Sequence, residues 1–561
     1  MKNLNALVIG LYLIFVLLSV LLLVPFTWFI GYGMCYITFP LAVLLASLIL
    51  HISGFCFLHH YKEIILSLLI IALCAVLSAF VMDISFDGQV YHQPTVYALS
   101  HGWNPIRDSH NPIISDKWGE NIWIDHYCRG METISASIVA FTGNMESGKA
   151  VNIIIAISLF CIIYSFLTRK VNTPISRGYA ILYAVLLTFS PTVVGQMFTY
   201  YIDLCGYYTF IVTGLSLYLI GYGNNKYAWF LLAACIILSG STKYNMFFWT
   251  AYIIFIFIIY LFSIHRIRDG IRIGVFSMLL ALVTILFVSY NPFITNTLDH
   301  SNPVYPLGGN DPNSPGLRVT ASGQPAYMAE YPQPLQVLIS LASRPQNDVN
   351  MPSYIHPYKH VLQSIPKSAG EGPCLGGAGF LFFECVILSL ILLILCERRE
   401  YTRRFLMFLI LYTLTPFLLP LGSNIRYVPF IYALPIIILL YSHFAGIKKG
   451  FGFLRSILLI FVVVNIAITT STTTIKQGIK QLTWVYYLDA IKGHPNEETY
   501  QTGNWSLQYK IIGCNESPRK VSNIENYSSN KLLSEPFSVF NREILDKDIE
   551  KRFLGRLITK Q

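Results

Sequence analysis

Two acidic residues that follow directly on an apolar run near the N-terminus are the first candidates for chemistry. Asp83 and Asp87 lie in the segment Met82 to Pro105, MDISFDGQVYHQPTVYALSHGWNP. A carboxylate at the end of a membrane span is costly unless it has a partner or a task. A carboxylate within hydrogen-bond reach of a hydroxyl can take its proton as a general base. Asp83 and Asp87, with Tyr91 and His92 about one helical turn after Asp87, are therefore the first candidates for a functional site.

The composition predicts a membrane-embedded scaffold for these residues. Of the 561 residues, 54% are hydrophobic and only 12% are charged, whereas a soluble domain carries about 25% charged residues. The apolar runs are continuous rather than alternating, which favours helical spans over a barrel. About thirteen runs approach the ~20 residues that a span needs, so we predict an all-α polytopic membrane protein. The predicted spans are 6–31, 34–55, 62–82, 150–168, 178–198, 203–221, 227–241, 244–263, 271–290, 379–396, 403–421, 428–444 and 453–470.

The short basic clusters between these runs predict the orientation of the chain. With a cytoplasmic N-terminus, nearly all of them fall on the cytoplasmic side, as the positive-inside rule requires. The net charge of +10 is thereby explained without nucleic acid. Residues 1–470 then form the transmembrane domain, with external loops at 83–149 and 291–378, and residues 471–561 form a small external C-terminal region. Apolar periodicity in the first loop predicts amphipathic interfacial helices.

This topology brings costly polar residues from at least five connections to the outer membrane surface. They are Asp83, Asp87, Tyr200, Tyr201, Asp203, Lys243, Tyr244, Asn245, Asn302, Tyr305, Arg426 and Tyr427. Each has an ordinary structural alternative. Asp87 and Asp203 are favoured helix N-caps, Lys243 could snorkel to the headgroups, and tyrosines are common in interfacial belts. The convergence of the whole set is more informative than any one member.

Three other patterns carry weaker signals. The segment GNMESGKA resembles a phosphate-binding loop, but it lacks the Ser or Thr after Lys149 and a preceding strand, so we predict no nucleotide site there. His92 has no second His or Cys at ligand spacing; it is more simply a helix-face histidine, and we predict no metal site, although a divalent metal is not excluded. Cys128 and Cys374 both fall outside the predicted spans and could pair, but the spacing has no framework signature.

The segment FDGQVYHQPTVYALSHGWNP resembles the GT-C superfamily of integral-membrane glycosyltransferases, which includes protein mannosyltransferases and lipid A aminoarabinose transferases. The shared features are an acidic residue at the membrane edge, a Tyr four residues later, and an interfacial helix ending in Gly-aromatic-x-Pro. The pieces TYYID, STKYN, NPVYP and IRYVPF support it. Many members have a second acid next to the first, whereas Gly88 follows Asp87 here. Asp83 is the alternative candidate for that role.

The resemblance implies a GT-C-like helical bundle and a sugar donor linked to a polyprenyl phosphate. The acceptor would be a hydroxyl on an extracytoplasmic glycan, lipid-linked saccharide or protein. Asp87 would be the base of an inverting displacement, and Lys243 and Arg426 would bind the leaving phosphate. Tyr91, Asn245 and Tyr305 would contact sugar, and Asp83 and Asp203 would orient the cations or the acceptor. The reaction requires no cofactor.

Two other classes of function remain open at this stage. A lipid-linked glycan polymerase or ligase would use paired arginines in a large external loop, for which Arg318 and Arg344 are candidates. A non-enzymatic lipid or sugar transporter would place charged residues in mid-span and break its helices in symmetric pairs. The charges of this chain gather instead at one membrane edge. The absence of eukaryotic sorting signals favours a bacterial inner membrane.

Overall fold

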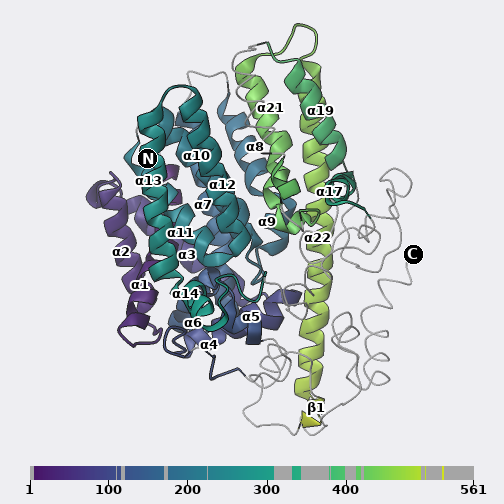
Figure 1. The fold of residues 1–561 in the computed structure, drawn as a ribbon. Helices are drawn as coiled ribbons and strands as arrows, with labels where there is room; N and C mark the ends of the chain where they lie inside the picture. Colours follow the sequence, from purple (N-terminus) through teal and green to yellow (C-terminus); the bar gives the residue numbers. More distant parts are fainter. Residues whose placement is uncertain are drawn as a thin grey trace, which may run out of the picture.

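The computed structural model is built almost entirely of helices (Figure 1). It describes residues 5–108, 110–114, 121–169, 175–223, 225–308, 331–342, 378–379, 381–397, 412, 414–418, 422–493, 499–500 and 521–522. The principal helices are α1 (Ala6–Phe29), α2 (Thr38–Ile52), α3 (Tyr61–Ala79), α4 (Gln93–Ser100), α5 (Asn121–His126), α6 (Gly130–Thr142), α7 (Ala150–Arg169), α8 (Arg177–Thr188), α9 (Pro191–Gln196), α10 (Asp203–Gly223), α11 (Lys226–Thr242), α12 (Tyr244–Ser263), α13 (Ile267–Val283), α14 (Tyr290–His300), α17 (Gln333–Ala342), α19 (Phe382–Ile394), α21 (Ala433–Ala445) and α22 (Phe453–Gly493).

Several of these helices have the length and composition of membrane spans. Seven stretches of the described residues qualify: Ala6–Phe29, Tyr61–Ala79, Met145–Thr168, Asp203–Gly223, Tyr244–Ser263, Ile267–Val288 and Phe453–Ser471. Shorter apolar helices, among them α2, α8, α11, α19 and α21, pack beside them. A helix that is apolar on all sides is either buried in a large core or surrounded by lipid. The predicted all-α polytopic membrane architecture is therefore confirmed at this level.

The bundle is organised around its first helix. α1 carries the sequence ALVIGLYLIFVLLSVLLLVPFTWF, and almost every side chain from Leu7 to Leu21 is buried. It packs against α2, α3, α7 and α11. The outer helix α13 is the opposite case, because Met278, Leu279 and Leu282 are exposed. Such apolar outer faces match a hydrocarbon surrounding.

The predicted span at 178–198 is not one continuous helix, because the structure breaks it into two helices. α8 ends at Thr188, and α9 begins at Pro191. The hydroxyl of Ser190 caps α9 by accepting a hydrogen bond from the N of Val193 at 3.5 Å. Proline has no N–H to donate and fits the first position of a helix rather than its interior. The pair Ser190–Pro191 therefore starts a new helix.

The first long loop contains helices, as predicted. The sequence predicts that they lie along the membrane surface, whereas α6 is packed inside the protein. α6 is buried along its length from Gly130 to Val139 and packs against α1, α4 and α11. A Cβ atom at Gly130 would lie 2.3 Å from the Oγ of Ser241, so only glycine permits this close approach to α11. The loop therefore forms part of the packed interior at one end of the bundle.

The last helix crosses the predicted boundary between the membrane domain and the C-terminal region without a break. α22 runs from Phe453 to Gly493, a length of about 60 Å at 1.5 Å per residue, and it projects beyond the other helices in Figure 1. The Nε2 of Gln477 donates to the O of Gly195 at 2.8 Å, which ties α22 to α9. Beyond it, the two-residue strands β1 (Thr499–Tyr500) and β2 (Val521–Ser522) pair in parallel.

The connections between α10 and α11, between α12 and α13 and between α21 and α22 lie at the end of the bundle opposite to α4, α5 and α6 (Figure 1). They carry basic residues such as Lys226, Arg266 and Lys448. The N of Glu397 donates to the O of Gly446 at 3.2 Å, which joins the connection after α19 to the one before α22. The Nη1 of Arg266 donates to the O of Gly221 at 2.6 Å, which joins the connections on either side of α11 and α12. The bundle therefore has one basic end and one end where the predicted site residues gather.

Candidate functional site

Four charged side chains form a continuous chain of ion pairs at the end of the bundle that carries α4, α5 and α6. The Nζ of Lys243 donates to Oδ1 of Asp203 at 2.8 Å, and the Nε of Arg426 donates to Oδ2 of Asp203 at 2.8 Å. The Nη2 of Arg426 also bonds Oδ2 of Asp87. We call these four residues the charge cluster. The structure thus brings the predicted base and the two predicted phosphate ligands together around Asp203.

Each member of the charge cluster is placed by the end of a helix. Asp203 is the first residue of α10, where the helix dipole favours a negative charge. Lys243 separates α11 from α12 with an extended backbone (φ −161°, ψ 138°). The N of Arg426 donates to Oδ1 of Asn424 at 3.1 Å, which starts the short helix Ile425–Tyr427. The four residues therefore come from four separate connections that meet at one place.

Asp87 is followed by an unusual helical segment. Residues Gly88–His92 form a π-helix, and Asp87 is its N-cap residue. Single-turn π-helices are rare and occur frequently at functional sites. This segment leads directly into α4 and carries both Tyr91 and His92. The local backbone geometry is therefore consistent with the functional role predicted for this stretch.

The side chains of the charge cluster are largely buried, but two of them are partly exposed to solvent. The side chain of Asp203 is 2% exposed and that of Lys243 is 9% exposed, whereas those of Arg426 and Asp87 are 16% and 15% exposed. The guanidinium of Arg426 lies 4.4 Å from the ring centre of Tyr201, and the ammonium of Lys243 lies 4.5 Å from that of Tyr427. Aromatic faces stabilise cations in this way. Asp87 and Arg426 form the accessible side of the cluster.

The electrostatics of the charge cluster keep its arginine charged. Burial alone would lower the pKa of Arg426, but the carboxylates of Asp87 and Asp203 more than offset this effect and hold that pKa well above its usual value. Burial raises the pKa of the hydroxyl of Tyr201 well above its usual range. Tyr201 therefore remains a neutral hydrogen-bond donor beside a permanent cation.

Asp203 is bonded from three sides and acts as the anchor of the cluster. Besides Lys243 and Arg426, the Nε2 of Gln196 donates to its Oδ2 at 3.0 Å. The Oε1 of Gln196 in turn accepts a hydrogen bond from the N of Leu204 at 2.9 Å. Both carboxylate oxygens are thus occupied by protein donors. This arrangement fits a residue that holds two cations in place rather than one that takes up a proton.

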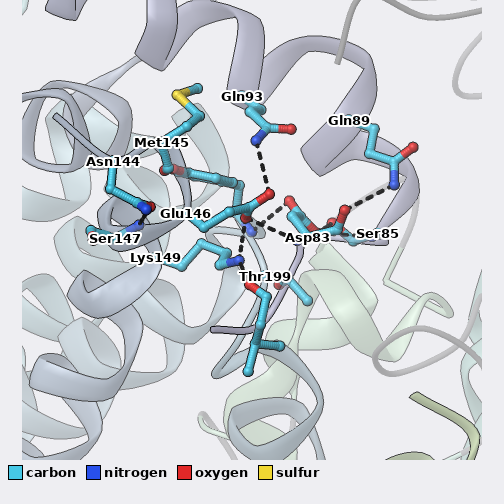
Figure 2. A network of polar contacts seen from close by, with 12 residues as sticks. Asp83, Ser85, Gln89, Gln93, Asn144, Met145, Glu146, Ser147, Lys149 and Thr199 are labelled. Atoms are coloured by element: carbon cyan, nitrogen blue, oxygen red, sulfur yellow. Dashed lines mark hydrogen bonds and ion pairs between the residues drawn. The ribbon is translucent and has the colours of Figure 1, made fainter. Parts of the chain in front are cut away.

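Asp83 lies near the charge cluster, next to the turn that carries Asp87, and its carboxylate accepts hydrogen bonds from backbone and hydroxyl groups. Its side chain is fully buried, and its Oδ1 accepts hydrogen bonds from the N and Oγ of Ser85 at 2.8 and 2.7 Å. Its Oδ2 accepts one from the N of Tyr200 at 3.1 Å. Figure 2 shows this carboxylate within a network of polar contacts. Asp83 therefore stabilises the turn that leads to Asp87. It also joins this turn to the segment before α10 that carries Tyr201.

A buried ion pair completes the network in Figure 2. Glu146 and Lys149 bond each other, and Lys149 also donates to the O of Val81. The Oε2 of Glu146 accepts a hydrogen bond from the N of Asp83 at 3.0 Å. The lysine of the GNMESGKA segment is therefore a structural side chain, which joins the start of α7 to the end of α3.

The close approach of Gly88 to Asp83 gives a testable prediction. A Cβ atom at Gly88 would lie 2.0 Å from Oδ2 of Asp83, far inside van der Waals contact. We expect Gly88→Ala to displace the turn, to lower the melting temperature by an amount that corresponds to about 1–3 kcal/mol, and to reduce activity through misplacement of Asp87. Thermal unfolding in detergent measures the first effect.

The control for this substitution is Gly214→Ala. Gly214 lies within α10, and a Cβ atom there meets nothing within 4 Å. Alanine is favoured over glycine in a helix interior by about 1 kcal/mol, so this variant should be neutral or slightly stabilised. Equal melting temperatures for the two variants would contradict the tight fit assigned to Gly88.

His92 forms a buried pair with Glu132. The Nδ1 of His92 bonds Oε1 of Glu132, and both side chains are at most 4% exposed. The ring of His92 also lies 4.2 Å from that of Tyr91, measured between ring centres. Within the residues that the structure describes, no group of three or more His, Cys, Asp or Glu side chains could hold a metal ion. His92 therefore positions Tyr91 and joins the π-helix to α6.

Four aromatic side chains lie in a row next to the segment that carries Asp87. The rings of Tyr91 and Trp123 lie 6.3 Å apart, those of Trp123 and Tyr127 5.7 Å, and those of Tyr127 and Tyr244 5.3 Å, each measured between ring centres. Asp87 and Arg426 both lie close enough to Tyr91 to influence it electrostatically. We call these four residues the aromatic wall. It offers apolar faces and hydroxyls, which suit a sugar ring.

Tyr305 and Asn245, the two remaining predicted sugar contacts, lie at the end of the aromatic wall. The O of Tyr305 accepts a hydrogen bond from the hydroxyl of Tyr244 at 3.4 Å, and its ring stacks on His300 at 3.8 Å between ring centres. Asn245 is the second residue of α12, and its Oδ1 is buried without a hydrogen-bond partner among the described residues. Both residues are close neighbours of Tyr244.

Sequence reasoning missed several members of this region. Trp123, Tyr127 and Gln196 carry no signal that separates them from ordinary aromatic and polar residues. Glu132 did carry one, because an acidic residue inside the apolar run METISASIVAF is costly without a partner. Its partner, His92, lies 40 positions earlier in the chain.

Two of the open alternatives concern residues outside the described part of the chain. Arg318 and Arg344, the candidate arginine pair of a polymerase or ligase, lie there. Cys374 lies there as well, whereas Cys128 is buried with a free thiol whose Sγ is 3.9 Å from the O of Gly240.

Comparison of the chain with protein-family models, with curated proteins and with solved structures finds no match.

Proposed function

We propose that this protein is an integral-membrane glycosyltransferase of the GT-C type. It moves a sugar from a polyprenyl-phosphate donor to a hydroxyl of an extracytoplasmic glycan, lipid-linked saccharide or protein. The observation that carries this proposal is the contact of Asp87 with Arg426, and of Arg426 with Asp203 and Lys243. A partly accessible acid beside two cations, at one end of a bundle of apolar helices, suits a reaction on a lipid headgroup.

The reaction is a single displacement at the anomeric carbon. The acceptor hydroxyl gives its proton to Asp87 while its oxygen forms a bond to the sugar. The bond between the anomeric carbon and the phosphate oxygen breaks, and its electron pair stays on that oxygen. The products are the glycosylated acceptor, a lipid phosphate with one more negative charge, and a protonated Asp87. Attack from the face opposite the leaving group inverts the anomeric centre.

The two cations stabilise the charge that develops on the phosphate. Arg426 can offer a bidentate hydrogen bond to phosphate oxygens, and Lys243 supplies a second, point-like charge. Asp203 holds both in place through bonds of 2.8 Å, so little reorganisation is needed when charge develops. The aromatic wall, with Asn245 and Tyr305 beside it, binds the sugar. No metal or nucleotide takes part in this scheme.

The same proposal assigns an orientation to the bundle. About thirteen helices cross a bacterial inner membrane, with the N-terminus and the basic end in the cytoplasm. The charge cluster and the C-terminal region then face the periplasm. The joining of the basic connections, through Glu397 with Gly446 and through Arg266 with Gly221, supports this orientation by the positive-inside rule.

The direct test is sugar transfer by the purified, full-length protein in nanodiscs. Labelled sugar would be supplied on polyprenyl phosphate, with a panel of lipid-linked saccharides and peptides as acceptors, and covalent product would be detected by mass spectrometry. Transfer that needs Asp87 would support the proposal. Movement of the intact donor across proteoliposomes without any covalent product would instead favour a transporter.

Lys243→Met should weaken the use of the donor. The substitution removes one of the two cations at the phosphate while keeping most of the apolar stem, and a hydrogen bond to a charged group is worth about 1.5–3 kcal/mol. We therefore expect the KM for the donor to rise by roughly tenfold to a hundredfold, with the KM for the acceptor little changed. Steady-state kinetics with each substrate varied in turn measures both.

Lys226→Met is the matched control for this variant. Lys226 is the exposed first residue of α11, the helix that ends just before Lys243, so the change removes the same charge at the opposite end. Its donor KM should equal that of the unmodified protein. An equal rise in both variants would assign the effect to net charge instead of phosphate binding.

A further inference from the structure

The two carboxylates that Arg426 holds differ in how firmly the protein binds them. Asp203 keeps donors from Lys243 and Gln196 if Arg426 is taken away. Asp87 has no other side-chain donor among the described residues, so its only ion pair is with Arg426. Asp87 is also the more exposed of the two acids, at 15% against 2%. Of the two ion pairs that Arg426 makes, the one with Asp87 is therefore the one that another anion can replace more easily.

The charge cluster is neutral when all four groups are ionised, because two carboxylates face two cations. A phosphate diester brings one negative charge and competes with Asp87 for the same guanidinium. The contact of Arg426 with Asp203 is made through Nε, and its contact with Asp87 is made through Nη2. The arginine can therefore stay anchored through one nitrogen while its outer nitrogen changes partner.

We propose that Arg426 acts as a latch on Asp87, which the phosphate of the incoming lipid-linked donor releases. Without the donor, Asp87 is held by the arginine and does not face the acceptor as a free base. When the phosphate takes over Nη2 of Arg426, Asp87 is set free at the moment when its proton acceptance is needed. This inference rests on the proposed function and adds an order of events, in which the donor binds before the base is released.

The latch makes a prediction that a simple catalytic base does not make. Asp87→Asn removes the carboxylate that competes with phosphate for Arg426, so the variant should bind lipid phosphate more tightly while it loses transfer. A ligand that binds only the competent fraction of a protein gains affinity when that fraction rises. We expect at least about a tenfold lower Kd for polyprenyl phosphate.

The measurement is equilibrium binding to the full-length protein in phosphatidylcholine nanodiscs. Polyprenyl phosphate is the probe, because it carries the phosphate but no transferable sugar. Asp87→Glu retains the charge and should keep the Kd near that of the unmodified protein. Asp108→Asn, which removes an exposed carboxylate at the same end of the bundle, should also leave the Kd unchanged.

Two further probes distinguish the source of the phosphate. Inorganic phosphate and phosphatidylglycerol would be tested on the same variants. Tightening for polyprenyl phosphate alone supports the latch on the lipid-linked donor, whereas tightening for inorganic phosphate alone would overturn that assignment. A Kd for polyprenyl phosphate that is equal or higher in Asp87→Asn, with an unchanged melting temperature, would overturn the latch itself.

Failure of the latch and failure of the proposed function give different results. If the unmodified protein transfers sugar but Asp87→Asn does not gain affinity, the latch fails and the glycosyltransferase proposal stands. If Asp87→Asn gains affinity but no lipid-linked sugar is ever transferred, the phosphate site and its latch stand and the glycosyltransferase proposal fails.

Discussion

Asp87→Asn should lower the rate of sugar transfer by about 10²–10⁴-fold, the usual contribution of a general base. The amide keeps the shape of the carboxylate but cannot accept the proton of the acceptor hydroxyl. The hydrogen bond between Arg426 and Asp203 remains, so we expect the variant to keep the structure of the charge cluster. Initial rates with saturating donor, measured at equal amounts of folded protein, report the effect on kcat.

The controls for this result separate chemistry from structure. Asp87→Glu restores a carboxylate at a slightly different distance and should recover part of the rate. Asp108→Asn should transfer sugar as the unmodified protein does. Normal kcat in Asp87→Asn, with a normal melting temperature, would refute the role of Asp87 as the base.

The convergence of the site could be predicted from the sequence because membrane topology limits the possibilities. Short basic clusters fix which ends of the helices face the same side, and an ionisable residue at such an end needs a partner. Asp87, Asp203, Lys243 and Arg426 are among the residues that these two constraints predict on one side of the membrane. Their direct contact required the structure, since neither constraint says which neighbours on that side touch.

The role of Asp83 could not be predicted in the same way. Whether a carboxylate faces a substrate or backbone N–H groups depends on the conformation of a turn of only a few residues. Here the N–H groups of Ser85 and Tyr200 occupy it, and the second of these lies 117 positions away. The break between α8 and α9 is different, because Ser190–Pro191 is a recognisable start signal for a helix inside an apolar run.

The removal of Asp203 should have the largest effect on stability in this region. Its side chain is 2% exposed and joins Lys243 to Arg426, so Asp203→Ala leaves two largely buried cations with one carboxylate between them. Breaking a buried ion pair by removing one partner costs about 3–5 kcal/mol. We expect a clearly lower melting temperature in detergent and a loss of transfer that follows from misplaced cations.

Asp269→Ala is the matched control for this loss, because Asp269 pairs with Arg266 where the two side chains are 44% and 35% exposed. An exposed pair is worth at most about 1 kcal/mol, so this variant should melt close to the unmodified protein. The double variant Asp203→Leu with Lys243→Met removes one charge of each sign and should recover part of the stability, but not the activity. A melting temperature for Asp203→Ala no lower than that of Asp269→Ala would mean that Asp203 is not the joint that holds the two cations, and the preorganised phosphate site would lose its physical basis.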